Sequence, residues 1–146
     1  MGVVLNRRSD ATVGDAVPPL AALVGSDELI FLGGPVQPGA VVVLADFAEP
    51  ERARELVFDG VGFLPGEIDD AAALGELHAV RVFAGYAGWG PGQLEVELEE
   101  GSWLVFSPRR SDVFTERPGE LWGDVLRREG GKYAVLARLP SDPRVN

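Results

Sequence analysis

Residues 81–103 read Arg-Val-Phe-Ala-Gly-Tyr-Ala-Gly-Trp-Gly-Pro-Gly-Gln-Leu-Glu-Val-Glu-Leu-Glu-Glu-Gly-Ser-Trp, and this segment sets five glycines among bulky aromatic residues. Glycine adopts positive φ and lets another chain or a ligand approach the backbone closely. Tyr86 and Trp89 bring large rings to the same turn. The segment is therefore either a structural turn with both rings packed into the core, which is the favoured interpretation, or a binding surface.

Apolar segments on both sides of this turn predict a mixed α/β architecture. Thr12 with Asp15 predicts a capped, brief helix that Pro18-Pro19 interrupts, and Asp59-Gly60 predicts a two-residue hairpin turn. Gly130-Gly131 predicts a helix end. The predicted strands are 2–6, 29–32, 41–44, 55–58, 61–64, 80–84, 103–106 and 133–137. The predicted helices are 20–24, 69–77, 92–100 and 119–129, with Leu121, Trp122, Val125 and Leu126 on the buried side of the last.

Composition describes one domain over residues 1–146. The chain is 46% apolar and 25% charged, and no apolar run approaches the roughly 18 residues that span a bilayer. It has no cysteine and one histidine, so disulfides, thiolate sites and histidine metal clusters are excluded. We therefore expect a cytoplasmic protein without a membrane segment, a metal or a cofactor.

The charge balance disfavours direct binding of nucleic acid. The chain carries 13 basic and 23 acidic residues, a net charge of −10, which repels a phosphate backbone. The basic clusters are Arg109-Arg110, Arg117 and Arg127-Arg128, and the tract that contains them is interrupted by acidic residues, namely Asp112, Glu116, Glu120 and Asp124. The partner is accordingly expected to be an unidentified protein or a small molecule, and the oligomeric state stays open.

Candidate binding residues gather at the glycine-rich segment. Arg81, Tyr86, Gln93 and Glu95 converge on a polar cleft beside an aromatic wall if the strand and the helix that flank the turn fold back on one another. The other candidates are Gly88, Trp89 and a second glycine-rich segment, Gly33-Gly34-Pro35. The remaining glutamates of residues 95–100 fit a solvated helix face, and His78 lacks an evident nucleophile, so no catalytic residue is assigned.

Motifs distributed over the chain resemble the YqgE/AlgH family, a group of small bacterial proteins described as uncharacterised or as proposed transcriptional regulators. The motifs that carry the resemblance are Gly2-Val-Val-Leu-Asn-Arg, Gly33-Gly34-Pro35-Val36, residues 81–95, the Trp103 strand, Leu121-Trp122, Gly130-Gly131-Lys-Tyr and Asp142-Pro-Arg-Val-Asn146.

This resemblance implies an α+β fold, with a mixed, bifurcated sheet that curls toward a pseudo-barrel and is flanked by helices. It supplies no catalytic residue, substrate or cofactor. Family members carry an apolar strand ahead of the Gly2–Asn6 strand and commonly have proline where Arg8 stands. We therefore expect that the chain lacks this N-terminal strand, that the Gly2–Asn6 strand has an unpaired edge, and that this edge favours self-association.

The sequence thus predicts a non-enzymatic cytoplasmic binding or regulatory domain, with the two glycine-rich segments as its functional surface. The alternative is an enzyme that acts on a small polar metabolite in the cleft of Arg81, Tyr86, Gln93 and Glu95. A direct DNA-binding regulator comes third, because of the net charge.

Overall fold

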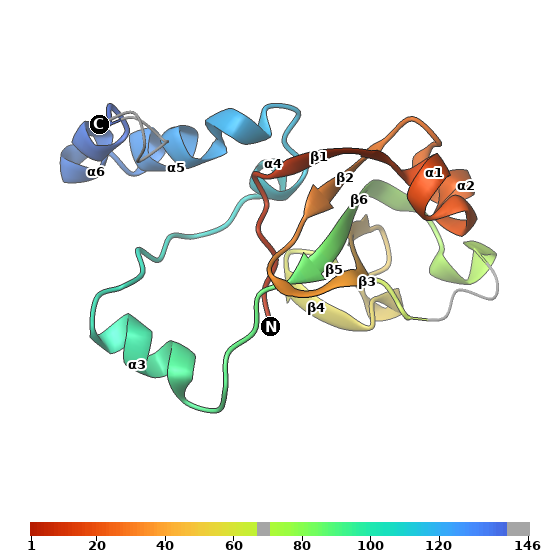
Figure 1. The fold of residues 1–146 in the computed structure, drawn as a ribbon, viewed down its shortest axis with the longest axis horizontal. Coiled ribbons are helices and arrows are strands. Elements are labelled where there is room, and N and C mark those ends of the chain that lie inside the picture. The colour runs from red at the N-terminus through yellow and green to blue at the C-terminus, as the bar shows by residue number, and fades with distance from the viewer. Residues whose placement is uncertain (67–70, 140–146) are drawn as a thin grey trace.

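Six strands form a mixed sheet at the centre of the fold (Figure 1). This computed structural model describes residues 1–66 and 71–139. The strand order is β1-β2-β6-β3-β5-β4, and only β2 and β6 run parallel. The strands are β1 (Arg8–Thr12), β2 (Leu29–Leu32), β3 (Val36–Phe47), β4 (Glu55–Phe58), β5 (Val61–Phe63) and β6 (Leu77–Tyr86). The α+β class is as predicted, whereas the sheet stays open, with β1 and β4 at its edges.

The two longest strands, β3 and β6, are paired antiparallel in the middle of the sheet and are apolar on both faces. Successive side chains of a strand point to opposite faces. Val43 and Val82 therefore join the core on one face, and Leu44 and Phe83 join the core on the other. This burial on both sides explains why the sequence at residues 43–45 is continuously apolar.

Short helical segments cover the first of these faces. They are α1 (Val13–Ala16), the 3-10 turn η1 (Pro18–Leu20) and α2 (Ala21–Val24). The Oγ1 of Thr12 accepts a hydrogen bond from the backbone N–H of Asp15 at 3.2 Å and donates one to the Asp15 carboxylate at 2.9 Å. The predicted cap, the brief helix and its interruption by the two prolines are all confirmed.

The hairpin of β4 and β5 is also confirmed. Asp59 and Gly60 form its two-residue turn and have φ of 42° and 83°. Two positive φ angles are what this turn requires, and Asp and Gly are among the residues that tolerate them. The 3-10 turn η2 (Pro50–Arg52) precedes the hairpin, and η3 (Ala71–Leu74) precedes β6.

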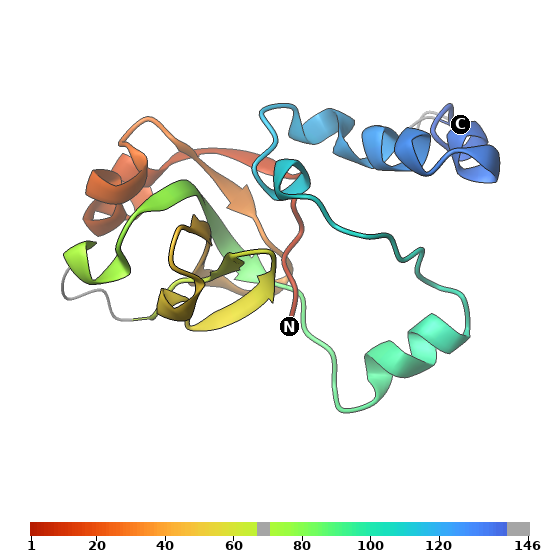
Figure 2. The same ribbon diagram turned by 180° about the vertical axis from the view of Figure 1, so that it is seen from behind.

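The chain beyond β6 forms an arm, residues 88–139, that leaves the sheet (Figures 1 and 2). Its elements are α3 (Gln93–Glu99), α4 (Arg110–Val113), η4 (Pro118–Glu120), α5 (Leu121–Glu129) and α6 (Gly131–Leu136). The arm returns to the sheet at α4, where Val113 is 4% exposed and belongs to the second core. The predicted helices at 92–100 and 119–129 are found, and Leu121 and Leu126 are buried, whereas Trp122 is 42% exposed.

Several local predictions in the arm and near the termini are wrong. Residues 103–106 have no regular secondary structure and no strand partner among the described residues, and residues 133–137 lie largely in α6. Gly2–Asn6 forms a single bridge, between Gly2 and Ala87. A strand requires a neighbouring strand for its backbone hydrogen bonds, and sequence periodicity does not reveal whether one is there.

Two further differences concern segments near β1 and β6. The helix predicted at 69–77 begins outside the described residues, and its later part is the turn η3 followed by the start of β6. Strand β1 was not predicted, because Arg-Ser-Asp-Ala-Thr is polar. Polar residues suit it as an edge strand, since three of its five side chains are exposed.

One ion pair inside the arm has a measurable effect on stability. Both guanidinium nitrogens Nη1 and Nη2 of Arg128 donate to the carboxylate of Asp112, at 2.8 and 2.9 Å, and the two side chains are 18% and 14% exposed. Burial by itself raises the pKa of Asp112, but hydrogen bonds from Arg128 and from the Arg109 backbone N–H outweigh it, so the pKa lies below its ordinary value.

We expect Arg128→Met to lower the free energy of unfolding by about 2–4 kcal/mol at pH 7, because it leaves the Asp112 carboxylate poorly solvated and without its ion pair. Since the folded pKa of Asp112 is depressed, the difference between the two proteins is complete above the ordinary pKa of 3.8 and disappears as the pH falls through the folded value. Urea unfolding at several pH values measures this. Arg127→Met is the matched control, because its partner Asp124 and Arg127 itself are 38% and 55% exposed. Equal losses in both variants would contradict the prediction.

Candidate functional site

The two glycine-rich segments pack against each other, backbone on backbone. The N–H of Gly33 donates to the carbonyl of Ala84 at 2.9 Å, and Gly33 accepts from Val4 at 2.8 Å. A Cβ on Gly33 would lie 2.3 Å from the carbonyl oxygen of Gly85, and a Cβ on Gly85 would lie 2.6 Å from that of Gly34. These glycines therefore permit a close approach of two chain segments, which is a structural role.

Other predicted residues of these segments are less constrained. Pro35 is exposed, and a Cβ on Gly88 would meet its nearest neighbours at an ordinary 3.7 Å. Tyr86 and Trp89 are each partly buried, and neither belongs to a core cluster. The predicted packing of both rings into the core is therefore wrong, because the chain leaves the sheet directly after Tyr86.

Trp89 instead belongs to a surface cluster with Glu97 and Trp103. The indole N–H groups of both tryptophans donate to the same carboxylate oxygen of Glu97, at 3.1 and 2.8 Å, and their rings meet edge to face at a centroid distance of 5.9 Å. Hydrogen bonds from Trp103, Gln93 and Trp89 hold the pKa of Glu97 below its ordinary value. The sequence assigned Glu97 to a solvated helix face, but this residue fastens α3 to the segments on either side of it.

Gln93 and Glu95 do not reach Arg81 in this structure. Gln93 donates to the Oε1 of Glu97 at 2.9 Å and accepts from the Gly90 N–H at 3.0 Å, and Glu95 is exposed on α3. Figures 1 and 2 show α3 well away from the sheet. The cleft predicted from Arg81, Tyr86, Gln93 and Glu95 is thus not assembled, and a binding role for its members stays a prediction.

Arg81 lies over the second core and connects β6 to α4. Its guanidinium carbon is 4.3 Å from the centre of the Phe31 ring, and its Nη1 donates to the carbonyl of Val113 at 2.9 Å. Burial lowers the pKa of Arg81, the charge of Arg8 lowers it further, and Glu28 opposes both effects. Arg81 therefore stabilises the return of the arm to the sheet.

Asp46 is a buried carboxylate that the sequence analysis missed. It is 6% exposed, and its Oδ1 lies 3.6 Å from the Nε of Arg110, which also donates to the carbonyl of Asp59 at 2.9 Å. The available signal was an acidic residue inside the apolar run of β3. Asp46 and Arg110 form a second connection between the sheet and α4.

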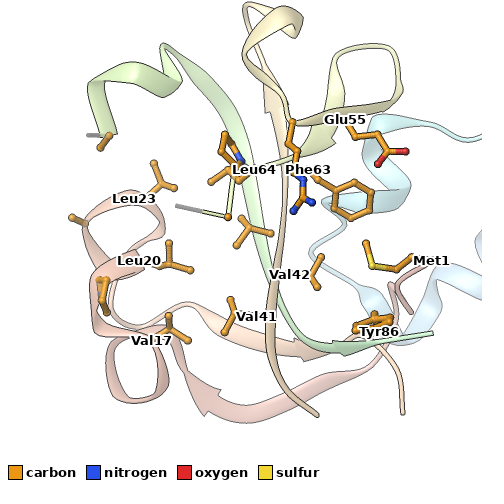
Figure 3. A pocket seen from close by; sticks show the side chains of 17 residues that line it. Met1, Val17, Leu20, Leu23, Val41, Val42, Glu55, Phe63, Leu64 and Tyr86 are labelled. Atoms are coloured by element: carbon orange, nitrogen blue, oxygen red, sulfur yellow. The ribbon is translucent and has the colours of Figure 1, made fainter. Parts of the chain in front are cut away.

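A cavity of about 540 Å³ lies against β3 and is the best-formed candidate for a binding site (Figure 3). Leu20 and Leu23 of the η1–α2 segment face Val41 and Val42 of β3 across it. Met1 and Tyr86 lie at its opposite end. Tyr86 is thus the one residue of the predicted cleft that lines this cavity.

The walls of the cavity are mainly apolar and carry few polar groups. Arg54, Glu55 and Tyr86 are its titratable side chains, and no hydrogen bond among these three is found in the described part of the chain. Within residues 1–66 and 71–139, no group of three or more His, Cys, Asp and Glu side chains is arranged to hold a metal ion. The arrangement suits retention of an apolar molecule with one polar end.

The sequence contains a signal for this cavity that the analysis did not use. Val17, Leu20 and Leu23 repeat at a helical spacing beside the prolines, and Val41 is 45% exposed although it belongs to an apolar strand. The contact between the two segments joins residues far apart in the chain. None of the helices in the described residues is long and apolar enough to cross a membrane.

Comparison with known proteins identifies the family. Residues 1–134 match the AlgH-like family. The chain is 41% identical over 152 aligned residues to a UPF0301 protein of Streptomyces coelicolor, covering 100% of this chain and 79% of that protein. A UPF0301 protein of Mycobacterium avium is 40% identical over 147 residues, covering 97% of this chain and 73% of that protein.

Two solved structures are similar over almost the whole chain. A crystal structure of a Corynebacterium diphtheriae protein has a TM-score of 0.82 at 28% identity and covers 94% of this chain and 74% of that one. The solution structure of the AlgH protein of Pseudomonas aeruginosa has a TM-score of 0.69 at 25% identity, and the match covers 97% of this chain and 78% of that one. The chain therefore belongs to the AlgH-like family.

Proposed function

We propose that this AlgH-like protein is a non-enzymatic, cytoplasmic binding domain with a regulatory role, and that its ligand is a small apolar molecule with one anionic end. The observation that carries the proposal is the cavity between the η1–α2 segment and β3. Its volume of about 540 Å³ lies within the range of small-molecule sites, which is roughly 300–1,000 Å³.

The anionic end of the ligand is inferred from Arg54. The neighbouring Arg52 pairs with Glu49 at 2.9 Å, whereas Arg54 makes no ion pair within the described residues although it lines the cavity. A carboxylate ligand would supply that partner. Glu55 at the same rim disfavours ligands with two anionic groups.

The two other functions receive less support. An enzyme acting on a polar metabolite requires groups that work together, and the cleft of Arg81, Gln93 and Glu95 is not assembled. A DNA-binding regulator requires a free basic face. Four of the five arginines in the basic clusters, Arg110, Arg117, Arg127 and Arg128, pair with carboxylates within 4 Å.

Binding of three ten-carbon probes tests the proposal. Decanoate, decanol and decylamine share an apolar chain and differ in the head group, and calorimetry measures each affinity. We expect decanoate to bind most tightly, and Arg54→Ala to weaken decanoate about tenfold, as expected for loss of a charge-assisted hydrogen bond, while leaving decanol unchanged.

A variant that fills the cavity separates this site from nonspecific adsorption. Val41→Trp should abolish binding of decanoate and decanol, because its ring occupies the cavity. Val105→Trp, at a position that is 73% exposed and far from this cavity in the fold, is the matched control and should bind normally. Equal binding by both variants, or no binding of any probe to the unaltered protein, would refute the proposed site.

A further inference from the structure

Two arginines from different strands of the sheet meet on one aromatic ring. The guanidinium carbons of Arg8 in β1 and Arg81 in β6 lie 5.9 and 4.3 Å from the centre of the Phe31 ring, and Phe31 belongs to β2, the strand between them. Arg8 also donates to the carbonyl of Glu116 at 3.3 Å. Arg81 donates to the carbonyl of Val113 at 2.9 Å. Two positive charges therefore converge where β1, β6 and the end of α4 meet (Figure 1).

These two guanidinium groups have donors to spare. Neither forms an ion pair within residues 1–66 and 71–139, whereas five other arginines there pair with carboxylates, namely Arg52, Arg110, Arg117, Arg127 and Arg128. A guanidinium carries five N–H donors, and Arg8 and Arg81 each donate to a backbone carbonyl. The remaining donors of Arg81 are accessible to solvent, because the buried polar side-chain atoms without a partner in the described residues belong to Asp46 and Arg52. A molecule from solution can therefore reach them.

The local charge at Arg81 is positive, although the chain as a whole is acidic. Burial lowers the pKa of Arg81 most, the charge of Arg8 lowers it next, and the opposing effect of Glu28 is smaller than either. Two like charges on one ring repel each other, and partial burial disfavours the charged form of Arg81. A bound anion would offset both costs.

We infer that Arg8 and Arg81 form a binding site for a phosphate group, either inorganic phosphate or the monoester of a small molecule. The planar guanidinium matches the oxygens of phosphate and carboxylate groups. A carboxylate has two oxygens, which a single bidentate arginine uses, whereas a phosphate monoester has three strong acceptor oxygens and can accept from two arginines at once. The net charge of −10 repels a long polyanion, so the ligand is small.

This site is separate from the cavity that carries the proposed function. Arg8, Phe31 and Arg81 are not among the residues that line that cavity. Phe31 belongs to the second core, whereas Leu20 and Leu23 of the cavity pack on the first. The phosphate site is therefore expected to act independently of the apolar ligand.

Titration calorimetry at constant ionic strength tests the inference, with inorganic phosphate, methyl phosphate and acetate as the probes. At about pH 8 both phosphates are mainly dianions, because the second pKa of a phosphate monoester is about 6. We expect inorganic phosphate to bind at least about tenfold more tightly than acetate, because it engages both arginines. Comparable binding of methyl phosphate would identify a monoester as the ligand class, and binding of inorganic phosphate alone would identify free phosphate.

Variants of the arginines complete the test. Arg8→Gln removes one cation at an exposed position and should weaken phosphate about tenfold. Arg7→Gln is the matched control, since Arg7 is adjacent and also exposed but makes no ring contact within the described residues, and it should change the affinity at most about twofold. Arg81→Lys keeps the charge without the planar donor group and should also weaken phosphate. If Arg81→Lys does not fold, the comparison of the Arg8→Gln and Arg7→Gln proteins still decides.

Other results would overturn the inference. Equal affinity for phosphate and acetate would show that the two guanidinium groups do not act together, and absence of phosphate binding would remove the site. Equal losses in the Arg8→Gln and Arg7→Gln proteins would show a response to net charge alone. Decanoate binding distinguishes the two sites, because Arg8→Gln should leave it unchanged whether or not phosphate binds.

Discussion

Gly34→Ala is expected to lower the free energy of unfolding by more than about 3 kcal/mol, because the added methyl group has no space. A Cβ at Gly34 would lie 2.2 Å from the carbonyl carbon of Tyr86 and 2.3 Å from its oxygen. Both atoms belong to the backbone, so the clash is not relieved by rotation of a flexible side chain. Relief requires separation of the two glycine-rich segments.

Urea unfolding, followed by far-ultraviolet circular dichroism, measures this effect. Gly39→Ala is the matched control, since a Cβ there meets no atom within 4 Å. We expect that control to change stability by no more than about 0.5 kcal/mol. If the Gly34→Ala protein were as stable as the Gly39→Ala protein, the two glycine-rich segments would not pack as described.

Phe83→Ala should have the next largest effect, a loss of about 3–5 kcal/mol. Phe83 is fully buried, at 0% exposure, and its ring lies 5.9 Å from the ring of Phe31. The second core includes Val61 and Val113, which come from β5 and from the arm. Loss of the Phe83 ring therefore leaves a cavity where the sheet and α4 meet.

The same urea titration tests this prediction, and the size of the side chain provides a graded series. Phe83→Leu retains most of the apolar volume and should lose clearly less than Phe83→Ala. Val105→Ala removes apolar groups at a position that is 73% exposed and should change stability by at most about 0.5 kcal/mol. A small effect of Phe83→Ala would place the ring outside the core and contradict the two-faced packing of the sheet.

Local chemistry explains which predictions from the sequence are confirmed. The Thr12 cap, the Asp59-Gly60 turn and the helix after Pro91 depend on residues close together in the chain. Their geometry is set by short-range hydrogen bonds and by the φ angles that each residue tolerates. The family resemblance was confirmed as well, because its motifs are spread over the whole sequence.

The failed predictions concern contacts between distant segments. Residues 103–106 have strand-forming side chains, but a strand needs a second strand, and none of the described residues supplies it. Residues 133–137 follow a diglycine and were predicted to be a strand, whereas the ring of Tyr133 packs on Phe106 in a helical segment. A short apolar run has a similar sequence pattern in a helix and in a strand, so its tertiary contacts decide which of the two it forms.

The candidate site also depends both on local sequence and on contacts between distant segments. The sequence by itself determined the Thr12 cap and the Asp59-Gly60 turn, since these follow from residue chemistry within a few positions, and its family resemblance gave the α+β class. Only the tertiary structure decided that the glycine runs pack on each other, that Glu97 joins two tryptophans, and that Tyr86 faces the η1–α2 segment across a cavity. These contacts bring together residues whose spacing along the chain carries no periodic signal, and they form only when the sheet orders β2, β6 and β3 side by side.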